Sequence, residues 1–401
     1  KAANPALRAL RNVVIVPSPG AYRGPGWDGF LARGDDVPIE VAQARIDAGG
    51  ADDVSDVMFT SGTTGEPKGV MLRHGTSLRC YQTYNDSFQL GEGDRHLVAT
   101  PFFHCFGYKA GWMLSVMFGA TTIPVAVFDG DEVMAVIERE RVTHMPGAPT
   151  MFWAILDHPR RADHDLSSLR VAMVAAASVP EELVHRMREE LRLDTAMGGY
   201  GLTENHALVA LTLPDDPPDV VATTVGRVVA GLELRVVDDE GEEVPTGQRG
   251  ELLVRGFAHM NGYYDDPEAT AAVIVDGWLH TGDIVILDER GYLHIVDRKK
   301  DMVIVGGFNV APAEVEKALI GFEKIGQVAV IGIPDHHFGE VVAAFVIPKL
   351  GEAITAEDVI DYAREHVANY KVPRRVEIVD ALPLNATGKV LKGELRKRLS
   401  L

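Results

Sequence analysis

The 401-residue chain is long enough for about two or three domains, and its formal net charge is −19 at pH 7. This acidity excludes a non-specific nucleic-acid binder, which needs a basic face, and it disfavours docking on anionic lipid by charge. Cys80 and Cys105 are the only cysteines. Two cysteines exclude a disulfide framework or a cysteine-rich zinc site, so a reducing cytoplasm is the default expectation.

Strand and helix patterns alternate through the first half of the chain. A helix is expected over 27–32, after a helix-to-strand pattern at 8–16, and the Asp-, Gly- and Ala-rich segment 35–55 is expected to be mobile. The spacing of Ser178 and Glu181 predicts a capping box at the start of a helix. Alternation of this kind predicts a parallel sheet with helices on both faces.

The uncharged run 110–128 nearly reaches the length of a membrane span. Gly119 and Pro124 divide it into a helix followed by a strand. We therefore expect buried core here and no integral membrane segment.

The pattern changes from residue 226 onward. Alternating or β-branched strands separated by turns predict a smaller antiparallel unit, and Asp288-Glu-Arg-Gly291 is typical of a hairpin turn. Beyond the charged segment 297–301, Pro312 and Thr355 mark helix starts in a mixed region of about a hundred residues. The chain is thus predicted to be α/β, with parallel-type sheets flanked by helices, a small antiparallel β unit and a smaller α+β C-terminal domain.

The stretch Thr60-Ser-Gly-Thr-Thr-Gly-Glu-Pro-Lys-Gly69 combines hydroxyls, glycines and one lysine after an apolar run that predicts a strand. Glycines allow the backbone N–H groups to converge on one point, and Lys68 adds positive charge, which suits the phosphates of a nucleotide. It is not a Walker A loop, because Gly69 stands where Ser or Thr is required, and this argues against a P-loop kinase or GTPase. On composition alone, a surface loop is an equal alternative.

Four further segments carry residues that suit nucleotide chemistry. Tyr200-Gly-Leu-Thr-Glu204 offers an aromatic face, a hydroxyl and a carboxylate for Mg²⁺. Asp283 suits ribose hydroxyls, Arg298 offers a guanidinium, and Pro383-Leu-Asn-Ala-Thr-Gly-Lys389 presents a lysine on a turn. Taken singly, each is more simply explained as a turn acid, a surface charge or a helix-terminal carboxylate.

Together, in this order and spacing, the five segments resemble the acyl-adenylate-forming superfamily of acyl-CoA synthetases, luciferases and peptide-synthetase adenylation domains. The resemblance runs from Val54 to the C-terminus. It implies an AMP-forming acid–thiol ligase that uses ATP, Mg²⁺ and CoA. It also implies a large domain at 1–297 with an incomplete first lobe, a hinge at 298–301 that includes Lys300, and a mobile C-terminal domain at 302–401.

The resemblance implies nucleotide and CoA contacts at individual positions. The β- and γ-phosphates of ATP would be wrapped by Thr60, Ser61, Gly62, Thr63, Thr64, Gly65 and Lys68. Adenine would be framed by Ala175, Ala176, Ala177, Gly199 and Tyr200. Ribose would be bound by Asp283 and Arg298, and the pantetheine arm would pass Gly306 and Gly307.

The catalytic group implied by the resemblance is Lys389, Thr203, Glu204 and His104. A carboxylate attacks the α-phosphate, pyrophosphate leaves, and the CoA thiol then takes the acyl group from AMP. Lys389, together with Mg²⁺ held by Glu204, would stabilise the negative charge that grows at the α-phosphate. Thr203 would contact phosphate and His104 would act as a gate beside the acyl pocket, although a hydrogen-bonded core imidazole is the alternative. Cys105 is expected to pack rather than react.

Three departures from the family pattern stand out. Only 59 residues precede the glycine-rich stretch, where the family usually has more, so we expect exposed apolar surface where a fuller first lobe would pack. Ala311 stands where tyrosine is common, and Ala175 stands where glycine is common. Neither substitution removes a charge from the reaction.

Alternatives remain open at this point. An adenylation enzyme that loads a carrier-protein phosphopantetheine is the nearest, and a non-catalytic nucleotide-binding relic is more distant. The segment 102–111 is similar to that of actinobacterial fatty-acid-type CoA ligases, including those for steroid-derived ring acids, and small residues at Gly198, Gly199 and Ala207 would leave room for a medium-chain, long-chain or cyclic acid. Basic groups for CoA include Arg73, Lys371, Arg374 and Arg375. Whether the chain forms a homodimer is left open.

Overall fold

The computed structural model describes residues 14, 26–60, 67–175, 179–349, 351–384 and 390–399. The chain divides into two compact units, residues 1–53 and 54–401. In the first unit, α1 (Trp27–Leu31) confirms the expected helix, whereas the expected pattern at 8–16 lies almost wholly outside the described residues. The segment expected to be mobile contains a helix, α2 (Ile39–Asp47), since this stretch has no internal Gly or Pro and Gln43 donates to Asp47 one turn on at 2.8 Å.

The second unit is built around a seven-stranded sheet in the order β4-β3-β5-β6-β7-β8-β9. The first five of these strands run parallel, which confirms the expected topology, and the last two pair antiparallel. Their bounds are Thr121–Pro124, Arg95–Val98, His144–Gly147, Val171–Val174, Thr195–Tyr200, Ala210–Leu211 and Arg227–Val228 in that order.

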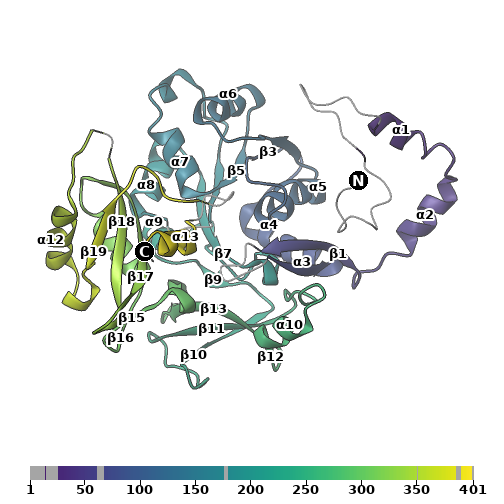
Figure 1. Ribbon diagram of the computed structural model, residues 1–401. Helices are drawn as coiled ribbons and strands as arrows, with labels where there is room; N and C mark the ends of the chain where they lie inside the picture. Colours follow the sequence, from purple (N-terminus) through teal and green to yellow (C-terminus); the bar gives the residue numbers. More distant parts are fainter. Residues whose placement is uncertain are drawn as a thin grey trace. The chain divides into compact units, whose positions relative to one another are not determined.

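Helices cover both faces of this sheet, as Figure 1 shows. Along β6, Ala172 and Val174 pack against α6, α7 and α8, while Val171 and Met173 pack on the opposite face against α3 and α5. This alternation is the two-residue period of a strand buried on both sides. The helices are α3 (His74–Phe88), α5 (Leu114–Phe118), α6 (Gly130–Glu140), α7 (Pro149–Leu156) and α8 (Glu181–Glu190), with the short η3 (Arg161–Asp163) after α7 and α9 (Pro218–Thr223) before β9.

One detail of α8 differs from the sequence prediction. The helix begins at Glu181, with Pro180 as its N-cap and no side-chain cap, so the predicted capping box from Ser178 is wrong. Pro180 has φ −66° and ψ 141° and takes the N-cap position, so the helix begins at Glu181, two residues later than a cap at Ser178 would place it. Ser178 itself lies outside the described residues.

The uncharged run after residue 109 is split between helix and strand, as predicted. It begins inside the π-helical turn η2 (Tyr108–Met113), which follows α4 (Cys105–Gly107), and it continues as α5 and β4. A Cβ added at Gly111 would lie 2.7 Å from Val98, so this glycine lets the turn pack closely on β3. None of the described helices is long and apolar enough to cross a membrane.

A hairpin and an antiparallel sheet stand beside the parallel sheet. The hairpin is β1 (Val54–Thr60) with β2 (Lys68–Arg73). The sheet has the order β10-β11-β13-β12, with β14 on β13, and its predicted turn is confirmed because Gly291 has φ +83° and donates to Asp288 at 3.0 Å. Its elements are β10 (Leu232–Val237), β11 (Arg249–Gly256), α10 (Pro267–Val273), β12 (Ile274–Val275), β13 (Trp278–Leu287) and β14 (Leu293–Arg298).

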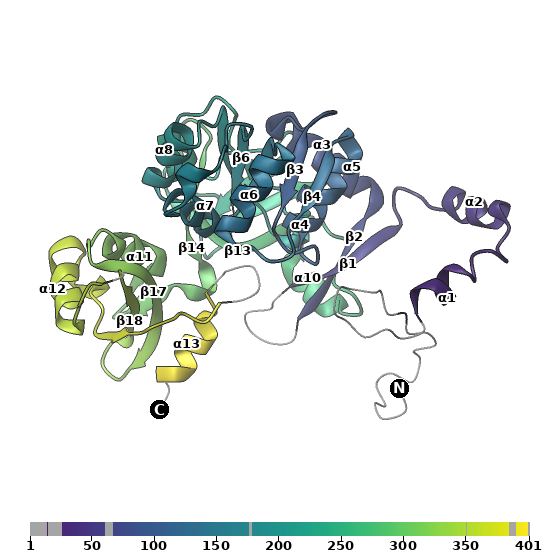
Figure 2. The ribbon, with the colours of Figure 1, turned by 90° about the horizontal axis from the view of Figure 1, so that it is seen from above.

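The C-terminal part forms its own sheet, in the order β16-β15-β18-β17 with β19 parallel to β18. Helices α11 and α12 cover one face and α13 covers the other (Figure 2). As predicted, Pro312 begins α11 and Thr355 forms a capping box with Asp358. The elements are η5 (Lys299–Asp301), β15 (Val303–Val305), β16 (Phe308–Val310), α11 (Pro312–Ile320), β17 (Ile325–Asp335), β18 (Gly339–Pro348), α12 (Ala356–His366), η6 (Asn369–Lys371), β19 (Arg375–Ile378) and α13 (Lys392–Leu399).

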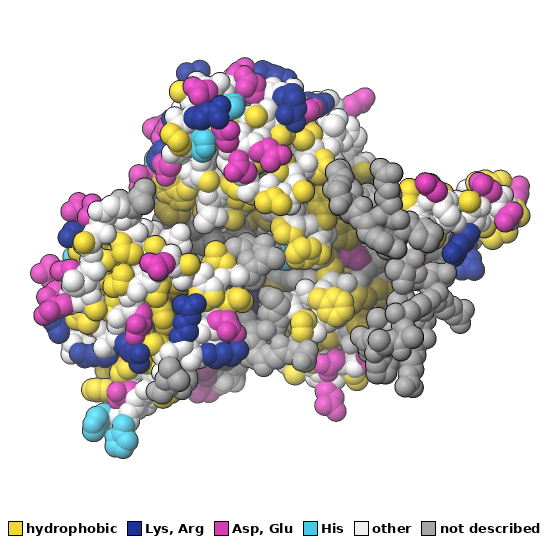
Figure 3. All heavy atoms as spheres, turned by 45° about the horizontal axis from the view of Figure 1, so that its top comes forward, with side chains coloured by type: hydrophobic (Ala, Val, Ile, Leu, Met, Phe, Trp, Pro, Cys, Tyr) yellow, Lys and Arg dark blue, Asp and Glu magenta, His cyan; other side chains and the backbone are white. Residues whose placement is uncertain are grey.

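The second unit exposes several large apolar side chains. Phe103, Val116 and Val127 are 69%, 72% and 76% exposed. Figure 3 shows hydrophobic side chains at the surface over much of the drawn face, with acidic and basic groups interspersed at its edges. Which residues would cover these side chains stays a prediction.

Candidate active site

The two strands that flank the glycine-rich loop form an antiparallel hairpin. Thr60 and Lys68 are register partners at its open end, and the Thr60 hydroxyl donates to the Lys68 carbonyl at 3.4 Å. The hairpin therefore fixes both ends of the loop 61–66. The predicted phosphate contacts Ser61, Gly62, Thr63, Thr64 and Gly65 lie outside the described residues.

The carboxylate proposed for Mg²⁺ lies near this hairpin. Thr203 and Glu204 belong to the short η4 (Thr203–Asn205), which follows the end of β7. Glu204 Oε1 accepts a hydrogen bond from the hydroxyl of Tyr263 at 2.8 Å, and Lys68 Nζ lies 4.8 Å from the centroid of the same ring. Tyr263 thus brings two predicted site residues, 136 positions apart, to one place.

Three predicted nucleotide contacts form a second cluster. Asp283 is only 3% exposed, and its Oδ1 lies 2.7 Å from Arg298 Nε. The Tyr200 hydroxyl donates to the other oxygen of Asp283. Burial, and next the Asp283 charge, raise the pKa of Tyr200 well above its ordinary value, so the phenol stays a neutral donor. Pairing of β13 with β14 sets Asp283 opposite Arg298.

The predicted adenine contacts lie at the carboxyl ends of adjacent parallel strands, where α/β sheets commonly bind ligands. Ala175 follows β6, and Gly199 lies on β7, its neighbour. A Cβ at Gly199 would lie 2.4 Å from Met173 and 2.8 Å from Leu211. The expectation that Gly199 leaves room for substrate is therefore wrong, because core side chains fill its open side. Ala176 and Ala177 lie outside the described residues.

At Gly198 a Cβ would make only ordinary contacts, at 3.4 Å from the Val221 carbonyl and 3.7 Å from the Thr212 side chain, so the expectation for this residue stays a prediction. Its N–H also donates to the Thr212 hydroxyl at 2.8 Å. Of the two glycines, only Gly199 is required by the close packing of β7 against its neighbours.

His104 has a structural role in the described chain. Its Nδ1 accepts from the Phe106 N–H at 3.2 Å and caps α4, and burial lowers the pKa of its imidazole. Its neighbour Cys105 is fully buried with its sulfur 3.2 Å from that of Met58, and burial raises its pKa to about 12. Cys105 therefore packs as predicted, and α4 is anchored against β1.

The remaining predicted residues belong to the C-terminal part. Gly306 and Gly307 form the turn between β15 and β16 with φ +56° and +87°, a conformation that favours glycine. The Gly306 N–H donates to the Phe338 carbonyl at 2.8 Å. These glycines are not part of the Asp283 cluster. Lys389 lies outside the described residues.

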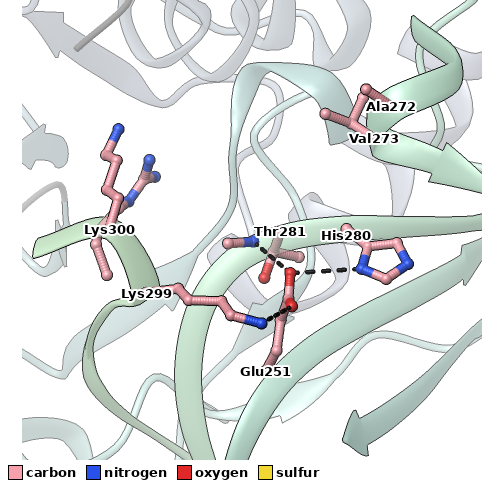
Figure 4. Close-up of a pocket in the computed structure, with 9 residues that line it drawn as sticks. Glu251, Ala272, Val273, His280, Thr281, Lys299 and Lys300 are labelled. Carbon is pink, nitrogen blue, oxygen red and sulfur yellow. Dashed lines mark hydrogen bonds and ion pairs between the residues drawn. The ribbon is translucent and has the colours of Figure 1, made fainter. Parts of the chain in front are cut away.

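A cavity of about 470 Å³ adjoins the predicted hinge. In Figure 4, Glu251 lies between Lys299 and His280, at 3.1 Å from Lys299 Nζ and 3.5 Å from His280 Nδ1. Lys299 also pairs with Asp239 at 3.0 Å. The first residue of η5 is therefore tied to the antiparallel sheet. The sequence does not reveal this link, because nothing in it distinguishes Glu251 of β11 from the other acidic residues nearby.

The donor set fits Mg²⁺ that takes most of its ligands from nucleotide and water. Within the described ranges there is no group of three or more His, Cys, Asp or Glu side chains that could hold a metal alone. Glu204 uses Oε1 for Tyr263, and among the described residues Oε2 makes no hydrogen bond or ion pair. One carboxylate oxygen with phosphate oxygens is an ordinary arrangement for this cation.

Comparisons with known proteins all indicate the same enzyme family. Residues 13–264 match the AMP-binding enzyme family, and residues 314–389 match the AMP-binding enzyme C-terminal domain. The chain is 49% identical over 393 residues to 3-[(3aS,4S,7aS)-7a-methyl-1,5-dioxo-octahydro-1H-inden-4-yl]propanoyl:CoA ligase of Rhodococcus jostii, which covers 97% of this chain and 74% of that protein. It is 41% identical to a feruloyl-CoA synthase from Amycolatopsis, over 92% of this chain and 74% of the relative.

Solved structures agree on both the large α/β domain and the smaller C-terminal domain. ATP-bound MatB from Rhodopseudomonas palustris superposes with a TM-score of 0.80 at 32% identity and covers 87% of this chain and 69% of its own. An anthranilate CoA ligase in complex with anthranoyl-AMP gives a TM-score of 0.78, also at 32% identity and 87% coverage of this chain, and 69% of its own. The chain thus belongs to the AMP-binding enzyme family and is an ATP-dependent, AMP-forming acyl-CoA synthetase.

Proposed function

We propose that this acyl-CoA synthetase activates a bulky cyclic acid, of the ring-bearing propanoate type. The observation that carries the proposal is the 49% identity, over almost the whole chain, to ligases of Rhodococcus jostii and Mycobacterium tuberculosis named for a bicyclic dioxo-propanoyl group. The 41% identity to a feruloyl-CoA synthase also favours a ring-bearing acid. A medium- or long-chain fatty acid is the second candidate, since a medium-chain acyl-CoA ligase of Macaca fascicularis is 35% identical over 86% of this chain.

A panel of acids scored by pyrophosphate release tests this proposal. It should contain acetate, octanoate, palmitate, ferulate and the bicyclic dioxo-propanoate. We expect kcat/KM to be highest for the bicyclic acid by at least about tenfold, a difference of roughly 1.4 kcal/mol in transition-state binding. Equal turnover of acetate and the larger acids would contradict a large acyl pocket, and a maximum at palmitate would select the fatty-acid alternative.

For the first half-reaction, we propose that the two clusters act on one nucleotide. Asp283 and Arg298 bind ribose, Lys68 attracts the phosphates, and Glu204 holds Mg²⁺, which when bound neutralises phosphate charge and polarises the α-phosphate. Lys389 completes the charge stabilisation from the C-terminal domain. Support comes from the convergence of Lys68 and Glu204 on Tyr263, and of Tyr200 and Arg298 on Asp283.

We also propose CoA, rather than a carrier protein, as the acceptor. A cavity of about 140 Å³ adjoins Gly306 and is lined by Phe308, Phe338 and Tyr370, with Arg374 at its side. The rings of Phe308 and Tyr370 stack with centroids 4.7 Å apart. Aromatic faces beside a guanidinium suit a phosphorylated adenosine, which free CoA carries and a carrier-bound pantetheine lacks.

Neighbouring arginines provide a matched test of the acceptor. Arg374→Ala should raise the KM for CoA several-fold without slowing pyrophosphate release. Arg375→Ala is the control, because that side chain pairs with Glu377 on β19 at 2.9 Å. Faster AMP release with a phosphopantetheinyl protein than with CoA would favour the carrier-loading alternative.

The domain division is likewise a proposal. We propose that residues 302–401 turn about 298–301 between the two half-reactions, relative to the large domain ending at 297. The short helix η5 spans Lys299–Asp301 within this segment, and Arg396 of α13 pairs with Asp301 at 3.0 Å. A rotation of the C-terminal domain would have to break or remake this pair.

A further inference from the structure

Tyr263 lies between two residues of the proposed nucleotide site. It donates from its hydroxyl to Glu204 Oε1 at 2.8 Å and presents its ring to Lys68 Nζ at 4.8 Å. Glu204 follows β7 of the parallel sheet, Lys68 begins β2, and Tyr263 lies between β11 and α10. A single side chain therefore links three segments that are distant in sequence.

The ring of Tyr263 is held firmly on all sides. It is 7% exposed and packs in a cluster with Met58, Val70 and Met260. Its backbone forms a bridge with Val70, and its N–H donates to the Thr270 hydroxyl at 2.8 Å. A donor fixed in this way can set the orientation of a flexible carboxylate, because the rotamers of the donor are already restricted.

We propose that Tyr263 is a positioning residue for the adenylation half-reaction, which orients Glu204 toward Mg²⁺ and keeps Lys68 beside it; this rests on the roles proposed above for those two residues. The hydrogen bond engages Oε1 and so directs Oε2 to the cation. The ring face attracts the ammonium of Lys68 and limits where it can go. Positioned charges stabilise a transition state without reorganising during the reaction.

The adjacent residue, Tyr264, is a matched control. It is 64% exposed, and it contacts the hairpin through its backbone N–H, which donates to the Gly69 carbonyl at 2.7 Å. Tyr264→Phe and Tyr263→Phe therefore remove the same atom one position apart, and only the second removes a hydroxyl bonded to Glu204.

The test compares these variants by the Mg²⁺ concentration that gives half-maximal pyrophosphate release, and by calorimetric titration of ATP at several Mg²⁺ concentrations. For Tyr263→Phe we expect both measurements to shift to about tenfold higher Mg²⁺, the effect of losing one hydrogen bond to a charged group. Thioester formation from supplied acyl-AMP should stay unchanged in Tyr263→Phe, and the melting temperature should fall by no more than a few degrees. Tyr264→Phe should match the wild type in every measurement. Tyr263→Leu, which also removes the ring, should bind ATP more weakly than Tyr263→Phe even without Mg²⁺.

The Glu204→Gln variant distinguishes two negative outcomes. In one, Tyr263 does not position Glu204; in the other, Glu204 does not hold Mg²⁺ at all. If Glu204→Gln abolishes the Mg²⁺ dependence while Tyr263→Phe behaves as Tyr264→Phe, Tyr263 does not position Glu204 and the inference falls alone. If Glu204→Gln keeps the wild-type Mg²⁺ dependence, the proposed role of Glu204 falls and the inference with it. A Tyr263→Phe protein that loses its melting transition, or slows both half-reactions equally, would assign Tyr263 a purely structural role and also overturn the inference.

Discussion

Arg298 Nε lies 2.7 Å from Asp283 Oδ1, across the register of two antiparallel strands. The Asp283 side chain is buried, at 5% exposed, whereas that of Arg298 is partly open to solvent, at 35% exposed. Tyr200 donates to the same carboxylate from the parallel sheet. The proposed ribose site is therefore held in place by strand pairing and by a hydrogen bond from the neighbouring sheet.

Asp283→Asn should weaken nucleotide binding more than it weakens the fold. The amide keeps one acceptor for Tyr200 but loses the charge that holds Arg298 and the second acceptor for ribose. We expect the KM for ATP to rise about tenfold to a hundredfold, at roughly 1.4 kcal/mol per factor of ten, with kcat less affected. Pyrophosphate exchange measures both. A KM equal to that of the control Asp219→Asn, at an exposed position in α9, would count against the ribose assignment.

A second pair of variants tests the two half-reactions separately. Lys389→Ala should abolish adenylate formation and leave thioester formation from supplied acyl-AMP largely intact. Gly307→Phe should do the reverse by blocking the pantetheine path. Gly307 has φ +87°, so any side chain there introduces backbone strain, but a Cβ at this position would meet no heavy atom within 4 Å.

The control for these variants is Gly393→Ala in α13, which has open space around it and an ordinary helical backbone. It should leave both half-reactions unchanged. If Lys389→Ala and Gly307→Phe damaged the same half-reaction, the proposed rotation about residues 298–301 would be wrong.

Some features of the candidate site can be predicted from residue types in the sequence. Others depend on contacts that only the folded chain makes. The turn Asp288–Gly291 predicts the pairing of β13 with β14, but its register alone would set Asp283 opposite Asp297. A bulge between Ile284 and Val285 shifts the partner to Arg298, and no local pattern predicts this bulge. Tyr263 is not predictable, because no local pattern distinguishes it from Tyr264. Only tertiary packing makes one tyrosine 7% exposed and the other 64%.

The type of a residue in the sequence also does not tell whether space is empty around it or whether it is buried. Gly199 suggests an open pocket in the sequence, yet Met173 and Leu211 from neighbouring strands occupy that space. Lys109 shows the opposite case, a charged residue that the fold buries completely. Both outcomes depend on contacts between segments far apart in the chain, which single-sequence patterns do not encode.

Lys109 gives a stability prediction. Its Nζ lies 2.9 Å from Asp56 Oδ2 and 2.6 Å from the Ser77 hydroxyl, joining η2 to β1 and α3. Lys109→Met leaves the Asp56 charge without this partner, and we expect a loss of about 3–5 kcal/mol in the free energy of unfolding. Adding Asp56→Asn should recover part of it, because the second charge is then also removed.

Urea denaturation of the single and double variants measures this coupling. Lys397→Met is the matched control, since that lysine is 75% exposed and its pair with Glu394 contributes less than about 1 kcal/mol. A Lys109→Met protein as stable as this control would show that Asp56 finds other partners or solvent.

We expect a steep loss of stability in mild acid, because three histidines are buried and uncharged in the folded chain. His96, His144 and His206 are fully buried. Burial lowers the pKa of His96 to about 3 and those of His144 and His206 to about 4, against an ordinary value of 6.5. Below pH 6.5 the three histidines bind protons in the unfolded chain but stay neutral in the folded chain. Their contribution to the free energy of unfolding is therefore complete above pH 6.5 and falls as the pH drops toward 4.

The slope should approach about 1.4 kcal/mol per pH unit for each histidine, and it should flatten near pH 4 for His144 and His206. Urea denaturation at intervals between pH 7.5 and 4.5 measures it. His206→Asn can still donate to the Ala258 carbonyl, which His206 Nδ1 meets at 2.8 Å, and it should lower the slope by about one histidine. An unchanged slope in His206→Asn, equal to that of the exposed-site control His337→Asn, would mean that His206 is protonated alike in the folded and unfolded chain.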